Sequence, residues 1–422
     1  MPRRASGIEP LTAATVFDYR PAPGRVVAVA PAPSARGAAL RIGGAMLLTM
    51  VPVTLIVPSI KELVADRFAA QSIWTHLFCA INLLGAILAT PLIAAITDRT
   101  TRRRAILAGL ALDAALLAAM GVAPSLAGLL TLRLFEGAAH MLAICGLMSA
   151  AADHAPPGQR GRFMGIVGAF MMFGTALGTR LGGIAWRLFP GATFEVAAAG
   201  ALIAILYVVL FVANAPRHTD RPRLRDALAL LRARSTIAVP YAYTFAERLC
   251  VGVTISSFVL FLASVHHLSP EIRSRLLALF LVPFALLIYP AGRLIDRVGP
   301  AAPLTFGSTA FALVFALYGF APAPLLAPLM LASGLFAALM FAPTLSLCAD
   351  LAPYDLRGAA FSGFNAAGSA GFVLGPLLGG AIVHMLESSA GPLTAYRAVF
   401  LSAAAVQLTV VLLTRRRLRR TR

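Results

Sequence analysis

Residues 152–183 read ADHAPPGQRGRFMGIVGAFMMFGTALGTRLGG, and residues 349–380 read ADLAPYDLRGAAFSGFNAAGSAGFVLGPLLGG. The second stretch begins 197 positions after the first, and the two align without a gap. They share an Ala-Asp pair, a proline, an Arg-Gly pair and four glycines. Agreement at this many unusual positions is improbable by chance, so we predict that the chain consists of two related halves.

The composition predicts that these halves lie in a membrane. Hydrophobic residues make up 59% of the chain and charged residues only 13%, against about 25% charged in soluble domains. The apolar residues come in runs of roughly 20, the length that a helix needs to cross hydrocarbon, where backbone polar groups must be paired within the segment. We expect an all-α membrane protein with twelve spans, at about 41–60, 72–96, 104–122, 125–150, 162–186, 194–214, 237–264, 276–295, 301–320, 325–348, 359–385 and 396–414.

The basic residues predict the orientation of these spans. The net charge is +19. When basic residues at the ends of spans are counted with the adjoining loop, 27 of the 36 Lys and Arg residues fall on the side that holds both termini, 6 fall on the other side and 3 lie within spans. Such a bias marks the cytoplasmic side. The basicity is therefore read as a topology signal, and no nucleic-acid partner is expected.

These spans predict five regions along the chain. A basic, disordered cytoplasmic tail at 1–40 precedes a six-helix bundle at 41–214. A basic cytoplasmic linker at 215–236 leads to the second bundle at 237–414, and 415–422 is a short basic tail. Heavy use of Ala and Arg with a single lysine, Lys61, favours a bacterial inner-membrane protein.

A related loop motif follows the second span of each half. It reads AAITDRTTRR at 94–103 and GRLIDRVG at 292–299. Membrane-flanking charge explains the arginines but not an Asp-Arg pair at the same place in both halves. A breakable charge pair at a tight hairpin can hold one of two conformations. The residues expected in such a conformational latch are Asp98, Arg99, Gly292, Asp296 and Arg297.

Charged residues inside two spans are candidates for function. Arg133, Glu136 and His140 are spaced i, i+3 and i+7, which places them on one face of a helix. Charge inside a membrane is costly, so such a face indicates a polar cavity or relay; the alternative is a structural interhelical ion pair. Glu247 and Arg248 are adjacent and should point in different directions. Asp113 is interpreted as a structural pairing group.

Small residues recur along 162–186 and 359–385 in the pattern that lets helices pack backbone to backbone. Simple close packing is sufficient to explain them. The positions of this helix-packing motif are Gly174, Gly178, Gly182, Gly183, Gly371, Gly375, Pro376, Gly379 and Gly380.

Together these motifs resemble the major facilitator superfamily of secondary transporters over roughly residues 40–414. Arg133, Glu136 and Gly137 match its Arg-x-x-Gln/Glu-Gly signature. The Gly-Pro-x-x-Gly-Gly core of the drug:proton antiporter branch is intact at 375–380, whereas Thr179 replaces the proline in the first half. The resemblance implies two pseudo-symmetric six-helix bundles around a central cavity lined by spans 1, 4, 7 and 10. The expected cavity residues are Thr49, Thr54, His140, Tyr241, Tyr243 and Thr244.

The function expected from the resemblance is secondary active transport of a small organic solute, as proton-coupled efflux. The candidate proton-coupling residues are Glu136 and Glu247 with Arg133 and Arg248. The alternatives are a proton-coupled importer of a metabolite and a non-transporting sensor or assembly protein. We expect no enzyme activity, because neither GxxxxGK[ST] nor HExxH is present. No cofactor or metal is expected, and the expected state is a monomer.

Overall fold

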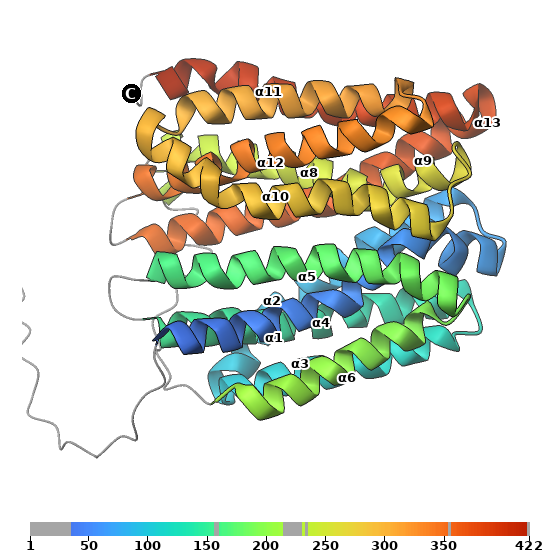
Figure 1. Ribbon diagram of the computed structural model, residues 1–422, viewed down its shortest axis with the longest axis horizontal. Coiled ribbons are helices and arrows are strands. Elements are labelled where there is room, and N and C mark those ends of the chain that lie inside the picture. Colours follow the sequence, from blue (N-terminus) through green and yellow to red (C-terminus); the bar gives the residue numbers. More distant parts are fainter. Residues whose placement is uncertain (1–34, 156–159, 214–229, 233–234, 353–355, 420–422) are drawn as a thin grey trace, which may run out of the picture.

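The computed structural model describes residues 35–155, 160–213, 230–232, 235–352 and 356–419. Throughout these ranges the regular elements are helices, as Figure 1 shows. The first half holds α1 (Ala35–Leu55), η1 (Val57–Ser59), η2 (Lys61–Asp66), α2 (Ser72–Arg99), α3 (Arg102–Gly121), α4 (Leu126–His154), α5 (Arg160–Leu188) and α6 (Thr193–Phe211). The second half holds η3 (Ser235–Ile237), α8 (Ala238–Val253), η4 (Thr254–Phe258), α9 (Val259–Ser264), α10 (Pro270–Val298), α11 (Ala301–Leu317), η5 (Tyr318–Phe320), α12 (Ala323–Leu351) and α13 (Arg357–Arg419).

Eleven segments of the described chain are long and apolar enough to cross a membrane. The last, Ala359–Arg415, has 57 residues and contains the two final predicted spans. Gly391 interrupts it with φ 79°, a conformation open mainly to glycine, and α13 runs across the molecule and back (Figure 1). The all-α fold with twelve crossings is confirmed.

The ends of the two halves differ slightly from the prediction. Helix α1 begins at Ala35, six residues before the predicted span at 41–60. The tail before residue 35 and most of the linker at 215–236 lie outside the described residues. At the end of that linker, Leu230 is buried against Ile237 and Tyr241, so this part of the linker packs on the second half.

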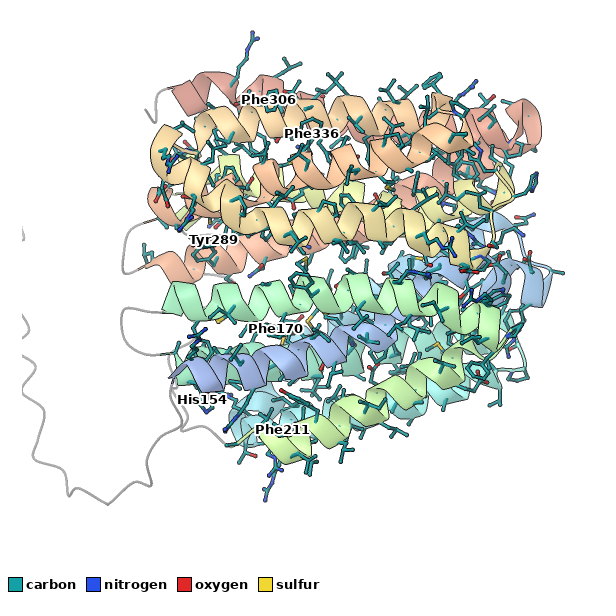
Figure 2. All side chains as sticks on the ribbon, in the orientation of Figure 1. His154, Phe170, Phe211, Tyr289, Phe306 and Phe336 are labelled. Carbon is teal, nitrogen blue, oxygen red and sulfur yellow. The ribbon has the colours of Figure 1, made fainter. Side chains whose placement is uncertain are left out.

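The outer flanks of the helices suit contact with lipid. Phe211 and Phe306, labelled in Figure 2, are 47% and 61% exposed. Large apolar side chains on a protein surface would cost free energy in water, but hydrocarbon accepts them. The exposed apolar surface therefore agrees with a bundle that lies in a bilayer.

Glycines of both halves hold equivalent helices in close contact. A Cβ atom at Gly174, Gly178 or Gly182 of α5 would overlap the backbone of α1. In the second half, Gly371 and Gly375 of α13 lie in the same way against the backbone of α8. The glycine pattern thus brings the first and fifth helices of each half together.

The two halves meet at the face opposite to the chain ends. We call the face where α1 begins and α13 ends the terminal face; it is at the left of Figure 1. At the other face, Gly183 of α5 packs on Ser274 of α10, and Gly380 of α13 packs on His76 of α2. Each contact joins one half to the other, and the repeat makes the two contacts equivalent.

Toward the terminal face the same helices diverge. Gly165 lies 18 positions before Gly183, and Gly292 lies 18 positions after Ser274, which is about five helical turns in each case. Gly165 and Gly183 therefore lie on one face of α5, and Ser274 and Gly292 lie on one face of α10. A Cβ atom at Gly165 or Gly292 would meet no described atom within 4 Å. Helices α5 and α10 touch at one face of the protein and separate toward the other.

These contacts predict that alanine at Gly182 is destabilising. The added Cβ would overlap the carbonyl oxygen of Leu55, and overpacking of this kind costs about 1–3 kcal/mol. Gly165→Ala in the same helix is the matched control, because it meets open space. Thermal unfolding of the detergent-purified variants should show a lower midpoint for Gly182→Ala alone. Equal midpoints would contradict the close contact between α1 and α5.

Candidate functional site

A cavity of ≈ 380 Å³ lies between the two halves. Most of its wall is apolar, and both halves contribute flexible or aromatic side chains. Its methionines and phenylalanines are Met50, Met141, Met171, Met172, Met340, Phe280, Phe284, Phe311 and Phe372. Methionine adapts its shape to irregular partners, so this wall suits apolar groups of varied shape.

A few polar and charged side chains interrupt this wall. They are Thr54, Asn82, Arg133, His140, Thr175, Thr179, Glu247, Arg248, Thr254 and Ser369. Among the predicted site residues, Thr54, Arg133, His140, Glu247 and Arg248 therefore line the cavity. Ligand pockets commonly combine an apolar wall with a small number of placed polar groups.

Four predicted cavity residues lie elsewhere, between packed helices. Thr49 donates a hydrogen bond to the carbonyl oxygen of Ala45 at 2.8 Å, and the Tyr243 hydroxyl accepts one from Thr414 at 3.1 Å. Tyr241 and Thr244 share a helical face with Arg248 but lie nearer the terminal face, where Tyr241 packs at Gly363 and Thr244 at Gly368. Helical spacing gives the direction of a side chain but not its depth along the helix.

Arg133 and Glu136 form an ion pair within α4, with 2.7 Å between Nη1 and Oε2. For these two residues the ion pair lies within one helix and not between helices. The same Glu136 oxygen accepts a hydrogen bond from Asn82 of α2 at 2.5 Å. Asn82 comes this close because Gly137 lets α4 touch the α2 backbone. Glu136 is fully buried and lies behind the cavity wall.

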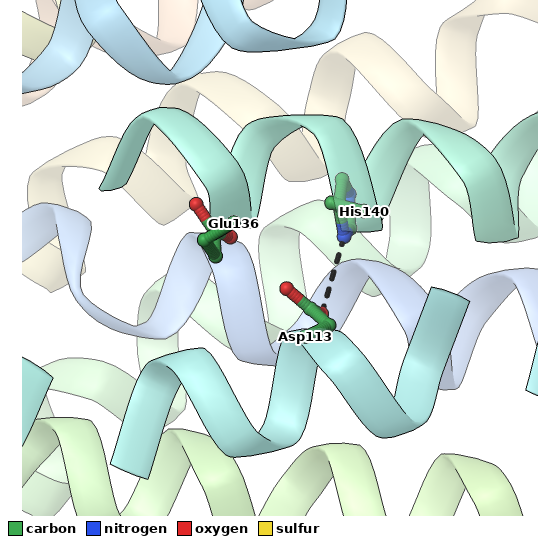
Figure 3. Close-up of side chains that lie close together, drawn as sticks. All are labelled: Asp113, Glu136 and His140. Carbon is green, nitrogen blue, oxygen red and sulfur yellow. Dashed lines mark ion pairs between the residues drawn. The ribbon is translucent and has the colours of Figure 1, made fainter. Parts of the chain in front are cut away.

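Asp113 of α3 points toward the same part of α4 (Figure 3). Its Oδ2 atom lies 3.5 Å from Nδ1 of His140. Helices α3 and α4 approach closely here because Gly109 packs against the backbone of Ala143. The partner of Asp113 is thus the histidine that borders the cavity, which gives Asp113 a place beside the candidate site.

The second half contributes Glu247 and Arg248 of α8. Both border the cavity although they are adjacent in sequence and their side chains leave the helix in different directions. Oε2 of Glu247 is buried and has no hydrogen-bond partner among the described residues. The Arg248 guanidinium lies 5.7 Å from the ring centre of Phe341. The cavity therefore has charged groups on two opposed walls.

Polar contacts between the halves close the cavity at the face opposite to the terminal face. The main one is the ion pair of Glu62 in η2 with Arg273 in α10. Further bonds join Arg187 to Glu271 at 3.3 Å, Ser72 to Glu387 at 2.7 Å, His76 to Ser257 at 3.0 Å and Arg180 to Ser274 at 3.2 Å. The sequence did not predict these partners, which lie far apart in the chain.

The predicted latch motifs lie at the terminal face. Helix α2 ends at Arg99, while the side chains of Asp98 and Arg99 lie outside the described part of the structure. Asp296 and Arg297 are exposed in the last turn of α10, next to Gly299. A buried pair that sequence reasoning missed, Arg102 with Asp153 at 2.9 Å, ties the start of α3 to the end of α4.

Two related six-helix halves around a central cavity with charged walls are the architecture typical of secondary transporters. The family model of the Major Facilitator Superfamily matches residues 42–269 and 241–422. The chain belongs to this family.

Solved transporters share the fold. A bacterial homologue of the human lysosomal transporter Spinster, inward-facing and unoccupied, has a TM-score of 0.77 at 15% identity over 92% of this chain and 98% of its own. A mutant of the nucleoside transporter NupG has a TM-score of 0.75 at 13% identity over 89% of this chain and 98% of its own. The human organic anion transporter MFSD10 (TETRAN) has 0.64 at 20% over 90% and 99%. At these identities the likeness is one of fold.

Proposed function

We propose that this protein exports a small amphipathic organic molecule across the bacterial inner membrane in exchange for protons, with both termini in the cytoplasm. The observation that carries the proposal is the central cavity, whose charged groups come from both halves: Arg133 and His140 from one, Glu247 and Arg248 from the other. A site at the interface of two halves can face either side of the membrane when the halves rock.

The cavity wall supports an amphipathic substrate. Methionine and phenylalanine side chains provide adaptable apolar contacts, and the charged groups would orient a polar head. The drug:proton antiporter branch is the proposed relationship within the family. The intact Gly-Pro-x-x-Gly-Gly sequence at 375–380 supports it. Thr179 lines the cavity where the branch usually has proline, so this position would contact substrate.

The divergence of α5 and α10 supports alternating access from this conformation. With the terminal face cytoplasmic, the conformation is inward-facing, as is that of the Spinster homologue. Closing the terminal face would bring the open surface at Gly165 toward that at Gly292. In this proposal Asp98, Arg99, Asp296 and Arg297 hold the closed terminal face together, and a single chain completes the cycle.

Buried carboxyl groups beside the cavity support proton coupling. Glu136 pairs with Arg133 within one half, and Glu247 lies beside Arg248 in the other. A carboxylate at this depth must be paired, wetted or protonated. Alternation among these states during the cycle would link proton movement to substrate movement.

Flux measurements in proteoliposomes test this function. The purified protein would be reconstituted with an internal pH-sensitive dye and exposed to amphipathic organic cations, such as ethidium, and amphipathic organic anions. We expect an imposed proton gradient to drive a compound in the direction opposite to the protons. Joint movement would indicate an importer. If no compound and no protons move across such a panel, the protein is not a transporter of this kind.

A further inference from the structure

We propose that Asp113, Glu136 and His140 form one proton-binding site, in which the two carboxyl groups share a single proton that His140 exchanges with the cavity. The inference rests on the proposed proton coupling and extends it. It assigns Asp113 as a second proton-binding carboxyl group and His140 as the route to the cavity.

The three side chains gather inside the first half of the protein. Asp113 comes from α3, and Glu136 and His140 come from successive turns of α4 (Figure 3). One oxygen or nitrogen atom of each lies within 4.8 Å of those of the other two. Asp113 and Glu136 are 0% exposed and His140 is 7% exposed. A proton can therefore pass among these groups without leaving the cluster.

A count of charge shows why the cluster needs one proton. Arg133 contributes one positive charge and pairs with Glu136. If both carboxyl groups are ionised and the imidazole is neutral, one negative charge remains in surroundings of low dielectric constant, where unpaired charge is strongly disfavoured. One added proton makes the cluster neutral.

Among the described residues, the neighbouring helices place no second positive charge beside the cluster that could replace the added proton. Facing the cluster, α2 contributes Cys79 and the neutral amide of Asn82. The described charged groups of the other packed helices lie toward their ends or bind elsewhere. They are Arg36 and Arg41 of α1, Arg180 and Arg187 of α5, Glu195 of α6 and, across the cavity, Glu247 and Arg248 of α8.

Several atoms of the cluster have unused hydrogen-bonding capacity. Both carboxylate oxygens of Asp113, Oε1 of Glu136 and both ring nitrogens of His140 are buried without a hydrogen bond to any described residue. Buried polar atoms are normally paired. A proton on one of these groups supplies the donor that the cluster lacks, since two ionised carboxylates and one neutral imidazole offer many acceptors but a single N–H.

The cavity wall indicates the route of the proton. His140, Arg133 and Asn82 border the cavity, whereas Asp113 and Glu136 lie behind them. Arginine keeps its proton and an amide does not titrate. Imidazole can accept a proton at Nε2 while it gives up the one on Nδ1, which lies 3.5 Å from Asp113. Uptake thus leaves a protonated carboxyl group and a neutral imidazole, and release follows the same steps in reverse.

Infrared titration of the purified full-length protein tests the shared proton without any substrate. The carboxylic acid band reports how many carboxyl groups become protonated between mildly alkaline and mildly acidic pH. We expect Asp113→Asn and Glu136→Gln each to remove a signal equal to one proton per chain, because Arg133 then balances the remaining carboxylate. Glu195→Gln, at an exposed position on α6, is the control and should leave the signal unchanged.

The rate at which the carboxylic acid band changes after a pH jump tests the relay, that is, the route of the proton through His140. We expect His140→Gln to retain the carboxyl titration and to slow it by an order of magnitude or more. If Asp113→Asn keeps the full titration, the shared proton is wrong. An unchanged rate in His140→Gln would refute the relay. If the band responds to sodium ions at constant pH instead of to protons, the site binds a cation and the proposal fails.

These outcomes are independent of transport. Loss of the titration in both carboxyl variants, together with no flux in the wild type, would retain the proton site and reject the proposed function. Proton-driven flux in the wild type together with an unaltered titration in Asp113→Asn would support the proposed function and reject the shared proton site. Each variant is checked by thermal unfolding, and Glu136→Gln tests the shared proton if Asp113→Asn does not fold.

Discussion

In Glu62→Gln, we expect the closed face opposite to the terminal face to open. Arg273 is buried to 0% exposed and forms its ion pair with Glu62 across the two halves. Its Nε and Nη1 atoms have no hydrogen-bond partner among the described residues. Removing the charged partner of a buried ion costs about 3–5 kcal/mol. Opening the interface lets water reach the guanidinium and avoids this cost, so a two-state equilibrium separated by a few kcal/mol would reverse.

Labelling of a buried cysteine at this face measures the change. Thr75→Cys places a thiol at a position of α2 that is 0% exposed, in a protein whose four native cysteines are replaced. We expect a maleimide that cannot cross the membrane to react at least tenfold faster when Glu62→Gln is added. Arg275→Gln is the matched control, since the Arg275 side chain is 58% exposed in its pair with Glu271 and such pairs contribute about 0–1 kcal/mol. Similar labelling rates in Thr75→Cys alone, with Glu62→Gln added and with Arg275→Gln added would show that the Glu62–Arg273 pair does not hold this face closed.

Arg133→Met should lower the stability of the first half by about 3–5 kcal/mol, because it leaves Glu136 buried without its cation. The guanidinium is 2.7 Å from the Glu136 carboxylate and 4.7 Å from the ring centre of Phe78. Methionine keeps much of the apolar contact with Phe78 but cannot balance the charge. The loss should therefore be electrostatic in origin.

The double variant Arg133→Met, Glu136→Gln tests this origin. A neutral amide at Glu136 removes the unpaired charge, so we expect the double variant to recover most of the stability lost by Arg133→Met. The unfolding midpoints in detergent of the wild type, the two single variants and the double variant form a double-mutant cycle. A double variant no more stable than Arg133→Met alone would assign the loss to packing, and a loss below about 1 kcal/mol would contradict a buried pair.

Much of the fold could be predicted from sequence because lipid imposes simple rules. A run of about 20 apolar residues must be a helix. The repeated glycines indicated which two spans would pack closely, but not that their partners are α1 and α8. The break that the sequence placed between residues 385 and 396 falls at Gly391, where a φ of 79° turns the chain from one span into the next.

The site could be predicted only in part. The i, i+3, i+7 spacing placed Arg133, Glu136 and His140 together because it depends on one helix alone. The role of Asp113 depends on how closely α3 approaches α4, which Gly109 decides through a tertiary contact. The Glu62–Arg273 pair joins residues 211 positions apart. Contacts of this kind follow from the arrangement of the halves, and a local pattern does not contain them.

The repeat also shows which features the two halves share and which they do not. Helix α12 begins and ends 197 positions after α4, so Arg133, Glu136 and His140 correspond to Met330, Ser333 and Ala337. Ser333 shares a hydrogen bond with Tyr318 at 2.6 Å, and Met330 is buried in an apolar cluster. The glycines that join backbones are present in both copies, whereas the ionisable machinery of α4 is present in one. The two copies thus keep the same helix contacts but place their charged groups on different helices: the first copy places them on α4, and the second places Glu247 and Arg248 on α8.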